Sequence, residues 1–442
     1  MGIINLTKPQ QLIYEMEKYS GGAISVICGS LLLNGNKNPD EIETAINELF
    51  KANDALRIRI SESNGTAYQE ICPFKNQEFE KLKFNSKNDL NDYAKEYAKQ
   101  PVDLYGSLCD VKIVVLPDKY GCLIKLHHII GDAWTLALLG TQLNAVFNGE
   151  TIQAYSYADY VESDSKYTSG RRYEKDRAFF LEQFKKCDEP MLLNEKSIKS
   201  VSSVRKTFII EKNDAELIRS YCNNKNLSPF MLFISALAVY INRIKMNQEK
   251  FYIGTAVLNR STVKDKNTAG MFINTIPLLI ELDNTGSFLE NISAVEESVL
   301  CTFRHQKFNY GDILKSIHQE YNFGEKLYDV MLSYQNAVIR GNETESEWYH
   351  SGEQSESLQI HIDDRDNENI YRIHYDYQTD KFSEDDIVAM HQHINNILFN
   401  GIKEDYKNIS EIEMLSETEY QKVIFDFNDT AVDYPKDKCV HE

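Results

Sequence analysis

A short segment at positions 122–135, Cys-Leu-Ile-Lys-Leu-His-His-Ile-Ile-Gly-Asp-Ala-Trp-Thr, concentrates the residue types that can do chemistry. An apolar run with the character of a strand ends on His127 and His128, three residues follow, and Asp132 stands where a helix is expected to begin. Neighbouring side chains of a strand point to opposite faces, so one imidazole can face a cavity while the other is packed. Asp132 is suited to cap the helix, to accept bonds from the loop, or to pair with a basic residue.

Three interpretations of this segment are open from the residues alone. Both histidines can be satisfied core residues, with Asp132 only a cap. His128 and Asp132 can be metal ligands four residues apart, a spacing that works on one helix face. Here, however, the histidines end a strand, and no Glu follows the first one. One neutral imidazole can also serve as proton acceptor or hydrogen-bond partner for a nucleophile delivered by a substrate. A serine nucleophile has no support, because no Gly-x-Ser-x-Gly motif occurs.

Composition narrows the class of protein. A chain of 442 residues suggests two or three domains, and 42% hydrophobic with 26% charged residues is ordinary globular composition. The formal charge is 48 − 67 = −19, which argues against nucleic acid and anionic membrane as main partners. The eight cysteines form no Cys-x-x-Cys pair, which argues against a zinc ribbon or dithiol site and fits a reducing compartment. The longest near-apolar run, 23–33, is too short to span a bilayer. We therefore expect a cytoplasmic protein with no membrane insertion.

Helix and strand patterns alternate along the chain. The pattern predicts strands at 23–33, 56–61, 67–71, 108–116, 121–128, 204–210, 251–257, 273–282, 330–337, 358–363 and 370–377. It predicts helices at 6–17, 39–52, 134–147, 214–223, 228–245, 287–306 and 385–399. The polar stretch 163–177 is predicted to be a linker between lobes. No repeat of 20–50 residues is present, and the alternation favours two lobes, each a sheet flanked by helices.

The pattern His127-His128-x-x-x-Asp132 resembles the HHxxxDG signature of the condensation domains of nonribosomal peptide synthetases, within the chloramphenicol acetyltransferase-like acyltransferases. Further segments resemble condensation-domain motifs in the same order over essentially the whole chain. They are LTKPQQLIY at 6–14, NDALR at 53–57, YADY at 157–160, IGTAVLNR at 253–260, GMFINT at 270–275, LYDVMLSYQN at 327–336 and FNDTAVDYPK at 427–436. Two departures stand out: Asn-Asp at 53–54 where His-Glu is commoner, and Ala133 where the signature has Gly.

The resemblance implies an α/β fold of two chloramphenicol acetyltransferase-like lobes that form a V with a central tunnel. It implies an N-terminal lobe at 1–170 that carries the HHxxxD motif. A C-terminal lobe at 171–425 would follow, with a floor loop near 254–275 and a crossing hairpin near 355–378. The last segment, 426–442, resembles a linker toward an adenylation domain.

The segments YEME, VLNRS and GMF are similar in sequence to the corresponding segments of starter condensation domains, and the first motif begins as early as Thr7. The resemblance thus implies amide formation in lipopeptide synthesis. A fatty acyl group from acyl-CoA or an acyl carrier protein would pass to an aminoacyl thioester on the phosphopantetheine arm of a downstream carrier domain. An internal condensation domain that joins two carrier-bound groups, a non-catalytic docking module of this fold and a stand-alone acyl-CoA transferase are the alternatives.

The resemblance also assigns roles. It implies that His128 is catalytic, as general base or as positioning group for the amine, and that His127, Asp132 and Arg260 hold the site, with Arg260 as partner of Asp132. Loop and acceptor access fall to Gly131, Ala133 and Trp134; Ala133 needs no special backbone angle, and Gly131 is expected to supply loop freedom. We expect no metal and no covalent cofactor. The expected partners are downstream adenylation and peptidyl carrier domains and the acyl donor, and the isolated domain is expected to be monomeric.

Overall fold

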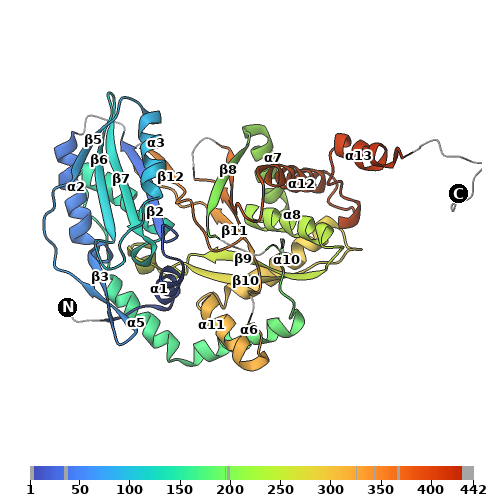
Figure 1. Cartoon of the computed structure of the whole chain (residues 1–442), viewed down its shortest axis with the longest axis horizontal. Coiled ribbons are helices and arrows are strands. Elements are labelled where there is room, and N and C mark those ends of the chain that lie inside the picture. Colours follow the sequence, from blue (N-terminus) through green and yellow to red (C-terminus); the bar gives the residue numbers. More distant parts are fainter. Residues whose placement is uncertain are drawn as a thin grey trace, which may run out of the picture. The chain divides into compact units, whose positions relative to one another are not determined.

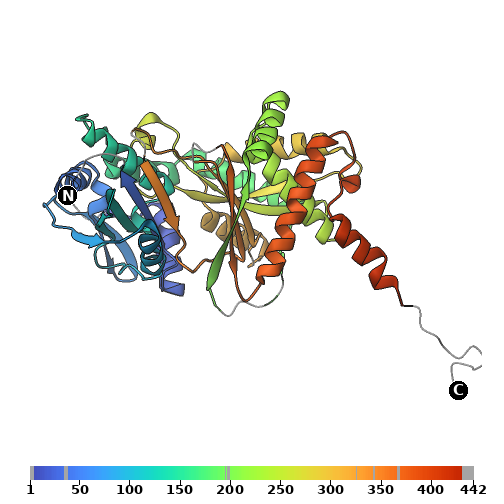
Figure 2. The same cartoon turned by 90° about the horizontal axis from the view of Figure 1, so that it is seen from above.

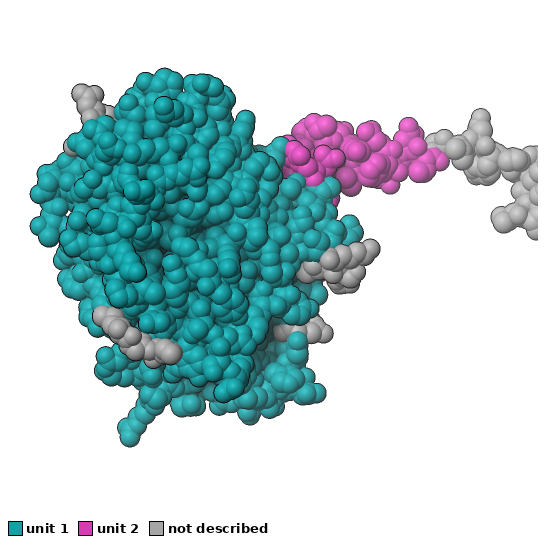
Figure 3. Space-filling model, turned by 60° about the vertical axis from the view of Figure 1, so that its left-hand side comes forward, with its two compact units in different colours: residues 1–217, 250–280, 297–383 teal, residues 218–249, 281–296, 384–442 magenta. Residues whose placement is uncertain are grey.

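The structure is a computed structural model that describes residues 4–33, 38–194, 196, 200–324, 326–341, 344–365 and 369–430. It divides into two compact units: one comprises 1–217, 250–280 and 297–383, the other 218–249, 281–296 and 384–442 (Figure 3). All the candidate site residues lie in the first unit. The lobe boundaries expected from the sequence follow a different division and stay a prediction. Of the predicted linker, residues 431–442 lie outside the described residues.

Two large sheets and a small one organise the first unit (Figures 1 and 2). The five-stranded sheet has the order β12 (Thr344–Tyr349), β2 (Val26–Leu33), β7 (Tyr120–His127), β6 (Cys109–Val115) and β5 (Glu80–Lys83). The six-stranded sheet has the order β10 (Asn274–Glu281), β9 (Lys250–Val257), β11 (Val330–Gln335), β13 (Leu358–Asp363), β14 (Tyr371–Gln378) and β8 (Ser203–Ile210). The small sheet has the order β1 (Ile4–Asn5), β4 (Thr66–Ile71) and β3 (Ile58–Ser63).

Helices connect these strands, and their ends carry the expected caps. In the first unit they are α1 (Lys8–Ser20), α2 (Pro39–Ala52), α3 (Lys87–Ala98), α4 (Ala133–Phe147), α5 (Tyr157–Thr168), α6 (Arg171–Lys186), α9 (Val263–Lys266) and α11 (Tyr310–Tyr321). In the second unit they are α8 (Pro229–Ile244), which packs on α12 (Glu384–Lys403), and α13 (Glu417–Ile424). Helices α7 (Lys212–Lys225) and α10 (Phe288–Phe303) extend across the division. Thr7 starts α1 in a capping box with Gln10, which fixes where the first helix begins.

The five-stranded sheet has an apolar core on both faces. The stripe of α2, which includes Ile42, Ile46 and Leu49, packs with side chains of α1 and α4 into one cluster. Leu90 and Ala94 of α3 belong to a second cluster with other side chains of the same strands. The near-continuous apolar runs of β2 and β7 follow from this, since both of their faces are buried. Burial on both sides makes the sheet a rigid support for the histidines at the end of β7.

Strand β12 connects the two large sheets, and the sequence did not predict it. It pairs antiparallel with β2 in the five-stranded sheet, although the chain reaches it from β11 and leaves it for β13, both in the six-stranded sheet. The hairpin expected to cross near 355–378 contains β13 and β14, which pair with each other inside the six-stranded sheet. The element that leaves the six-stranded sheet to pair in the five-stranded one is therefore β12, the strand that precedes this hairpin.

The stretch 163–177, predicted to be a linker between lobes, is helical and not an irregular loop; that it joins two lobes stays a prediction. It contains the end of α5 and the beginning of α6, and only Ser169 and Gly170 separate the two helices. Both helices bury one side, with Val161 on α5 and Phe180 and Phe184 on α6, and apart from the buried Asp176 most of their charged residues lie on the other side. A run of charges is as typical of a solvated helix face as of a loop.

Membrane-spanning potential is limited within the described part of the chain. No single helix is long and apolar enough to cross a bilayer, although the bent pair α7 and α8, at 103°, satisfies the length and composition criteria together.

Candidate active site

The end of β7 and the start of α4 position the histidine motif. The backbone N–H of His127 donates to Leu108 at 2.8 Å, and that of His128 donates to the carbonyl of Ser25 at 2.7 Å. His128 then opens a short 3-10 turn, His128–Ile130, before Asp132 caps α4. Backbone bonds to the residues that immediately precede β6 and β2 thus fix the backbone that carries the two imidazole rings.

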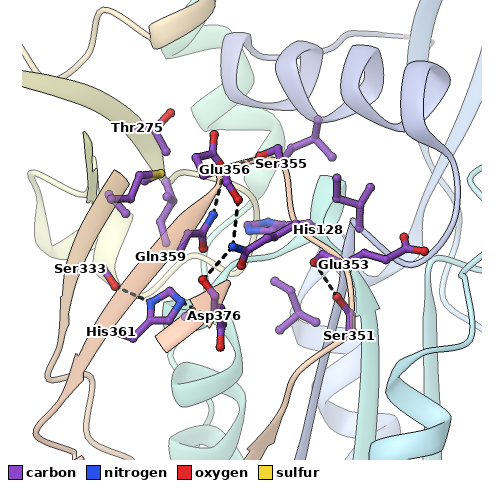
Figure 4. Close-up of a pocket in the computed structure, with 18 of the residues that line it drawn as sticks. His128, Thr275, Ser333, Ser351, Glu353, Ser355, Glu356, Gln359, His361 and Asp376 are labelled. Carbon is purple, nitrogen blue, oxygen red and sulfur yellow. Dashed lines mark hydrogen bonds and ion pairs between the residues drawn. The ribbon is translucent and has the colours of Figure 1, made fainter. Parts of the chain in front are cut away.

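His128 is a neutral imidazole in a cavity. Its Nδ1 lies 2.9 Å from the carbonyl oxygen of Gly131, and because a carbonyl only accepts, Nδ1 carries the hydrogen. The lone pair of the neutral ring is then on Nε2. Burial lowers the pKa of His128 below its usual value, which favours this neutral form. The ring lines a cavity of about 1130 Å³ within the first unit (Figure 4).

His127 has a different environment. It is 1% exposed, and its Nδ1 accepts the backbone N–H of Ile129 at 3.1 Å. Its Nε2 is 3.8 Å from a carboxylate oxygen of Glu17, beyond hydrogen-bond distance. Burial lowers the pKa of His127 to about 3. His127 therefore supports the turn that carries His128 and does not line the cavity.

Asp132 and Arg260 form a fully buried ion pair, with both side chains 0% exposed. Nη2 of Arg260 lies 2.9 and 3.0 Å from the two carboxylate oxygens. Asp132 also accepts the backbone N–H groups of Thr135, at 2.8 Å, and of Phe272, at 3.2 Å. We call the group Asp132, Thr135, Arg260, Gly270 and Phe272 the Asp132 cluster. It connects the start of α4 to the segment between β9 and β10, which corresponds to the floor loop expected from the sequence.

Gly270 is the point of closest approach in the Asp132 cluster. Its carbonyl accepts from Arg260 at 3.0 Å, and its φ is 150°. A Cβ at this position would lie 2.1 Å from the ring of Tyr157, so only glycine fits. Tyr157 in turn donates to the carbonyl of Met271 at 2.8 Å, and Tyr160 stacks on Phe272 at 3.8 Å. The YADY motif thus packs against the floor loop.

The three residues expected to control loop and acceptor access lie at the same corner. Ala133 is the first residue of α4 and lines the cavity, where it needs no unusual backbone angle. Trp134 also lines the cavity, and its indole N–H donates to the carbonyl of Lys266 at 2.9 Å. Gly131 has a φ of −168°, an extended angle open to any residue. The expected loop freedom of Gly131 is therefore wrong. Its Cβ would approach a methyl group of Leu126 at 3.1 Å, so space explains the glycine better.

The cavity has a second wall that the sequence reading missed. One face of the six-stranded sheet and the segment before β13 bring polar side chains to it: Arg205, His350 and His374, and also Ser333, Glu353, Glu356, Gln359, His361 and Asp376. Figure 4 labels the last six of these. The available signal was the alternation of polar and apolar residues along β13, where Gln359, His361 and Asp363 alternate with buried Leu358, Ile360 and Ile362. Alternation alone does not say which cavity a face will line.

Metal binding has no geometric support in the described residues. No group of three or more His, Cys, Asp or Glu side chains there is arranged to hold an ion.

Comparison with known proteins identifies the class. The family model described as "Condensation domain" matches residues 1–424. Surfactin synthase subunit 1 of Bacillus subtilis is 27% identical over 463 residues, which cover 99% of this chain and 13% of that protein. Gramicidin S synthase 2 of Aneurinibacillus migulanus is 25% identical over 452 residues, with 99% and 10% covered. The chain thus spans less than a fifth of the length of these two relatives.

Solved structures agree on the fold. The starter condensation domain of rhizomide synthetase in complex with C8-CoA superposes with a TM-score of 0.83 at 17% identity, covering 93% of this chain and 98% of that one. The first condensation domain of the calcium-dependent antibiotic synthetase, in complex with a substrate analogue, gives 0.82 at 16% identity, with 94% and 99% covered. The predicted α/β condensation-domain fold is confirmed.

The chain is therefore an enzyme of the acyltransferase class that forms amide bonds. It belongs to the condensation-domain family of nonribosomal peptide synthetases.

Proposed function

We propose that this condensation domain is a starter domain that acylates the amine of a carrier-bound aminoacyl thioester, with acyl-CoA or an acyl carrier protein as donor. The observation that carries the catalytic part is the neutral imidazole of His128, whose Nδ1 is held by Gly131 while the ring lines the cavity. Such a group can accept a proton from an amine at neutral pH.

The proposed reaction is a direct aminolysis. The amine nitrogen attacks the thioester carbonyl, the new C–N bond forms, and the C–S bond breaks. The proton released from the amine passes to Nε2 of His128 and from there to the departing thiolate. An α-amino group titrates near pH 8, so free amine is already available at neutral pH, and alignment by His128 contributes beside proton removal.

Asp132 and Arg260 are assigned a positioning role. Neither side chain is exposed, so neither is placed to touch a substrate. Their bonds to Thr135, Gly270 and Phe272 hold the start of α4 against the floor loop. In this proposal the ion pair keeps the turn that carries His128 in one conformation.

The starter role is supported by the comparison with the rhizomide starter domain, whose complex holds C8-CoA. The apolar side of the cavity supports it too, since Leu12, Ile13 and Met16 of α1 offer an alkyl chain a nonpolar surface. Downstream adenylation and peptidyl carrier domains are the proposed partners, and the phosphopantetheine arm of the carrier is the proposed acceptor tether.

The test combines octanoyl-CoA with an aminoacyl-pantetheine thioester and detects the N-octanoyl product by mass spectrometry. Wild-type chain is expected to form the amide, and His128→Ala to lower the rate by about 10²-fold or more, because both proton transfer and alignment are lost. His127→Ala is not a suitable control, since His127 supports the same turn. Thr275→Ala is better, because Thr275 also lines the cavity. Wild-type turnover by the His128 variant would contradict the assignment.

A second candidate is an internal condensation domain that joins two carrier-bound aminoacyl or peptidyl groups. The polar wall of the cavity favours it, since a peptidyl chain carries hydrogen-bonding groups that an alkyl chain lacks. Replacing octanoyl-CoA by a dipeptidyl-pantetheine donor in the same assay separates the two, because only the internal domain would prefer the dipeptidyl donor.

A further inference from the structure

The cavity that holds His128 has two unlike walls. Helix α1 and strand β2 contribute mainly apolar side chains, among them Leu12, Ile13, Met16 and Val26, beside the carboxylate of Glu15. Facing them, β8, β14, β13 and β11 contribute one polar residue after another. A ligand that fills such a cavity meets alkyl groups on one side and hydrogen-bonding groups on the other, so the chemistry of the second wall should select the ligand.

The hydrogen bonds within the polar wall are ordered around Asp376, which is 3% exposed. Two nitrogens of Arg205 donate to its two oxygens, both at 2.7 Å. Nε2 of His361 lies 3.3 Å and Nδ1 of His350 lies 3.4 Å from the same carboxylate. We call Arg205, His350, His361 and Asp376 the Asp376 cluster. In these contacts the N–H groups of the arginine and of the two histidines face a carboxylate of the protein itself.

Several of the groups left over in the wall are acceptors. Because Nε2 of His361 faces Asp376, its Nδ1 accepts in the neutral ring, and the hydroxyl of Ser333, 2.6 Å away, donates to it (Figure 4). The lone pairs of Ser333 remain available on the cavity side. Gln359 is similar, since its amide N–H donates to Glu356 at 2.9 Å and leaves the carbonyl oxygen. The wall therefore offers oxygen acceptors to a ligand.

The ionised residues that line the cavity leave an excess of negative charge. Arg205 is matched by Asp376, and Arg365 by Asp363, whose carboxylate accepts from its Nε at 2.8 Å. The remaining lining ions are the three carboxylates of Glu15, Glu353 and Glu356, against one ammonium group, that of Lys326. Three against one gives a field that attracts cations into the cavity.

Glu356 is the carboxylate of this set that lies within the polar wall. Its Oε2 accepts from the side chains of Ser355 and Gln359, which fixes the carboxylate beside the acceptor groups of Gln359 and Ser333. Among the described residues Oε1 has no hydrogen-bond or ion-pair partner. Glu353, by comparison, uses one oxygen to accept the backbone N–H of Ala23 at 2.7 Å, so it has a structural task.

We propose that the polar wall is a specificity subsite for a positively charged, hydrogen-bond-donating side group on one of the two substrates, and that Glu356 recognises its charge. The ligand class is an acyl or aminoacyl chain that ends in an ammonium group, as in a diamino acid or an ω-aminoacyl donor. The inference rests on the proposed amide-forming function and adds a substrate class to it. It makes Glu356 a specificity-determining residue that has no part in the proton transfer.

The experiment measures discrimination between matched substrates. In the acceptor arm, octanoyl-CoA is combined with lysyl-pantetheine or with 2-aminoheptanoyl-pantetheine, which have the same chain length with and without the ammonium group. In the donor arm, 8-aminooctanoyl-CoA is compared with nonanoyl-CoA on a leucyl acceptor. We expect the charged member of one pair to be preferred about tenfold in kcat/KM, and Glu356→Gln to reduce that preference to near parity. Rates with the uncharged members, measured on the same variant, are the reference for that preference.

The matched control is Glu15→Gln, which removes the same charge from the opposite wall and should leave the preference intact. Dissociation constants of 8-aminooctanoyl-CoA and lysyl-pantetheine, measured by titration calorimetry on both variants, provide a reading that needs no turnover. Absence of any amide product would contradict the proposed function, yet a Glu356-dependent affinity would still support the subsite. Equal affinities and equal rates within both pairs, or a preference that survives in Glu356→Gln, would overturn the inference.

Discussion

The cavity is bordered by two clusters that share one ion-pair chemistry and differ in environment. In the Asp132 cluster, aspartate and arginine are both 0% exposed, and the other partners of the pair belong to the protein's own backbone and Thr135. In the Asp376 cluster, the side chain of Arg205 is 24% exposed and that of Asp376 4%, and two imidazoles share the carboxylate. The same pair thus serves to fix the backbone where solvent is absent, and to order a binding surface where solvent reaches it.

Among the substitutions that test this difference between the clusters, Arg260→Ala should have the largest effect on stability. It leaves the carboxylate of Asp132 buried without its cation, so we expect the free energy of unfolding to fall by about 3–5 kcal/mol. Chemical denaturation followed by circular dichroism measures this loss. His128→Ala is the control and should unfold close to wild type, because the hydrogen bond of its ring to Gly131 spans only three residues of one turn. Equal stability of Arg260→Ala and wild type would show that the Asp132 cluster is not a structural support.

The second prediction concerns pH, and it separates the clusters because only the Asp376 cluster contains histidines. Burial lowers the pKa of His350 to about 4, against 6.5 for the free side chain. Below pH 6.5 the unfolded chain therefore binds a proton at this position, whereas the folded chain binds it only near pH 4. The free energy of unfolding consequently falls as the pH is lowered from 6.5 to about 4. A single group contributes at most about 1.4 kcal/mol per pH unit.

His350→Gln removes this group and keeps a side chain that can hydrogen-bond to Asp376. Unfolding free energies measured from pH 7 to pH 4 should therefore fall less steeply in this variant than in wild type. The carboxylate of Asp376 itself, whose pKa Arg205 and the imidazoles hold well below its usual value, loses its contribution only at still lower pH. An unchanged slope in His350→Gln would mean that this imidazole titrates alike in both states.

The smallest expected effect belongs to Arg205→Ala. Asp376 keeps His350 and His361 as partners, and the site is partly solvated, so we expect a loss of about 1 kcal/mol. The same denaturation experiment measures it beside Arg260→Ala. A loss as large as that of Arg260→Ala would remove the distinction between the two clusters.

Much of the local structure could be predicted because its causes are local. Asn64 and Gly65 both have positive φ and form the turn of the predicted hairpin. Ser228 caps α8 with Pro229 in its first turn. The segment 127–132 was also readable, since two histidines at a strand end and an aspartate cap are local features. The contact between Asp132 and Arg260 was expected from resemblance, and only the structure supplies its distances and burial.

The features that sequence reasoning missed depend on pairing between distant strands. Ser333, His361, His374 and Thr207 form one row because β11, β13, β14 and β8 pair in that register. The sequence of any one of these strands does not predict such a row. Strand β12 was missed for the same reason, since its partner β2 lies far away in the chain. The assigned roles of His128 and of the residues around it stay predictions until the variants are assayed.

The pairing of β12 with β2 has a consequence for the synthesis of the chain and for its truncation. Leu33 pairs with Thr344, so both edges of β2 are covered only after β12 has been synthesised. Until then the run Val-Ile-Cys-Gly-Ser-Leu-Leu-Leu presents an open, apolar edge of the kind that recruits other strands. A fragment ending at residue 170 would keep that edge permanently. Truncation within this domain therefore invites aggregation, and a hybrid synthetase should exchange the segment through β12 as one piece.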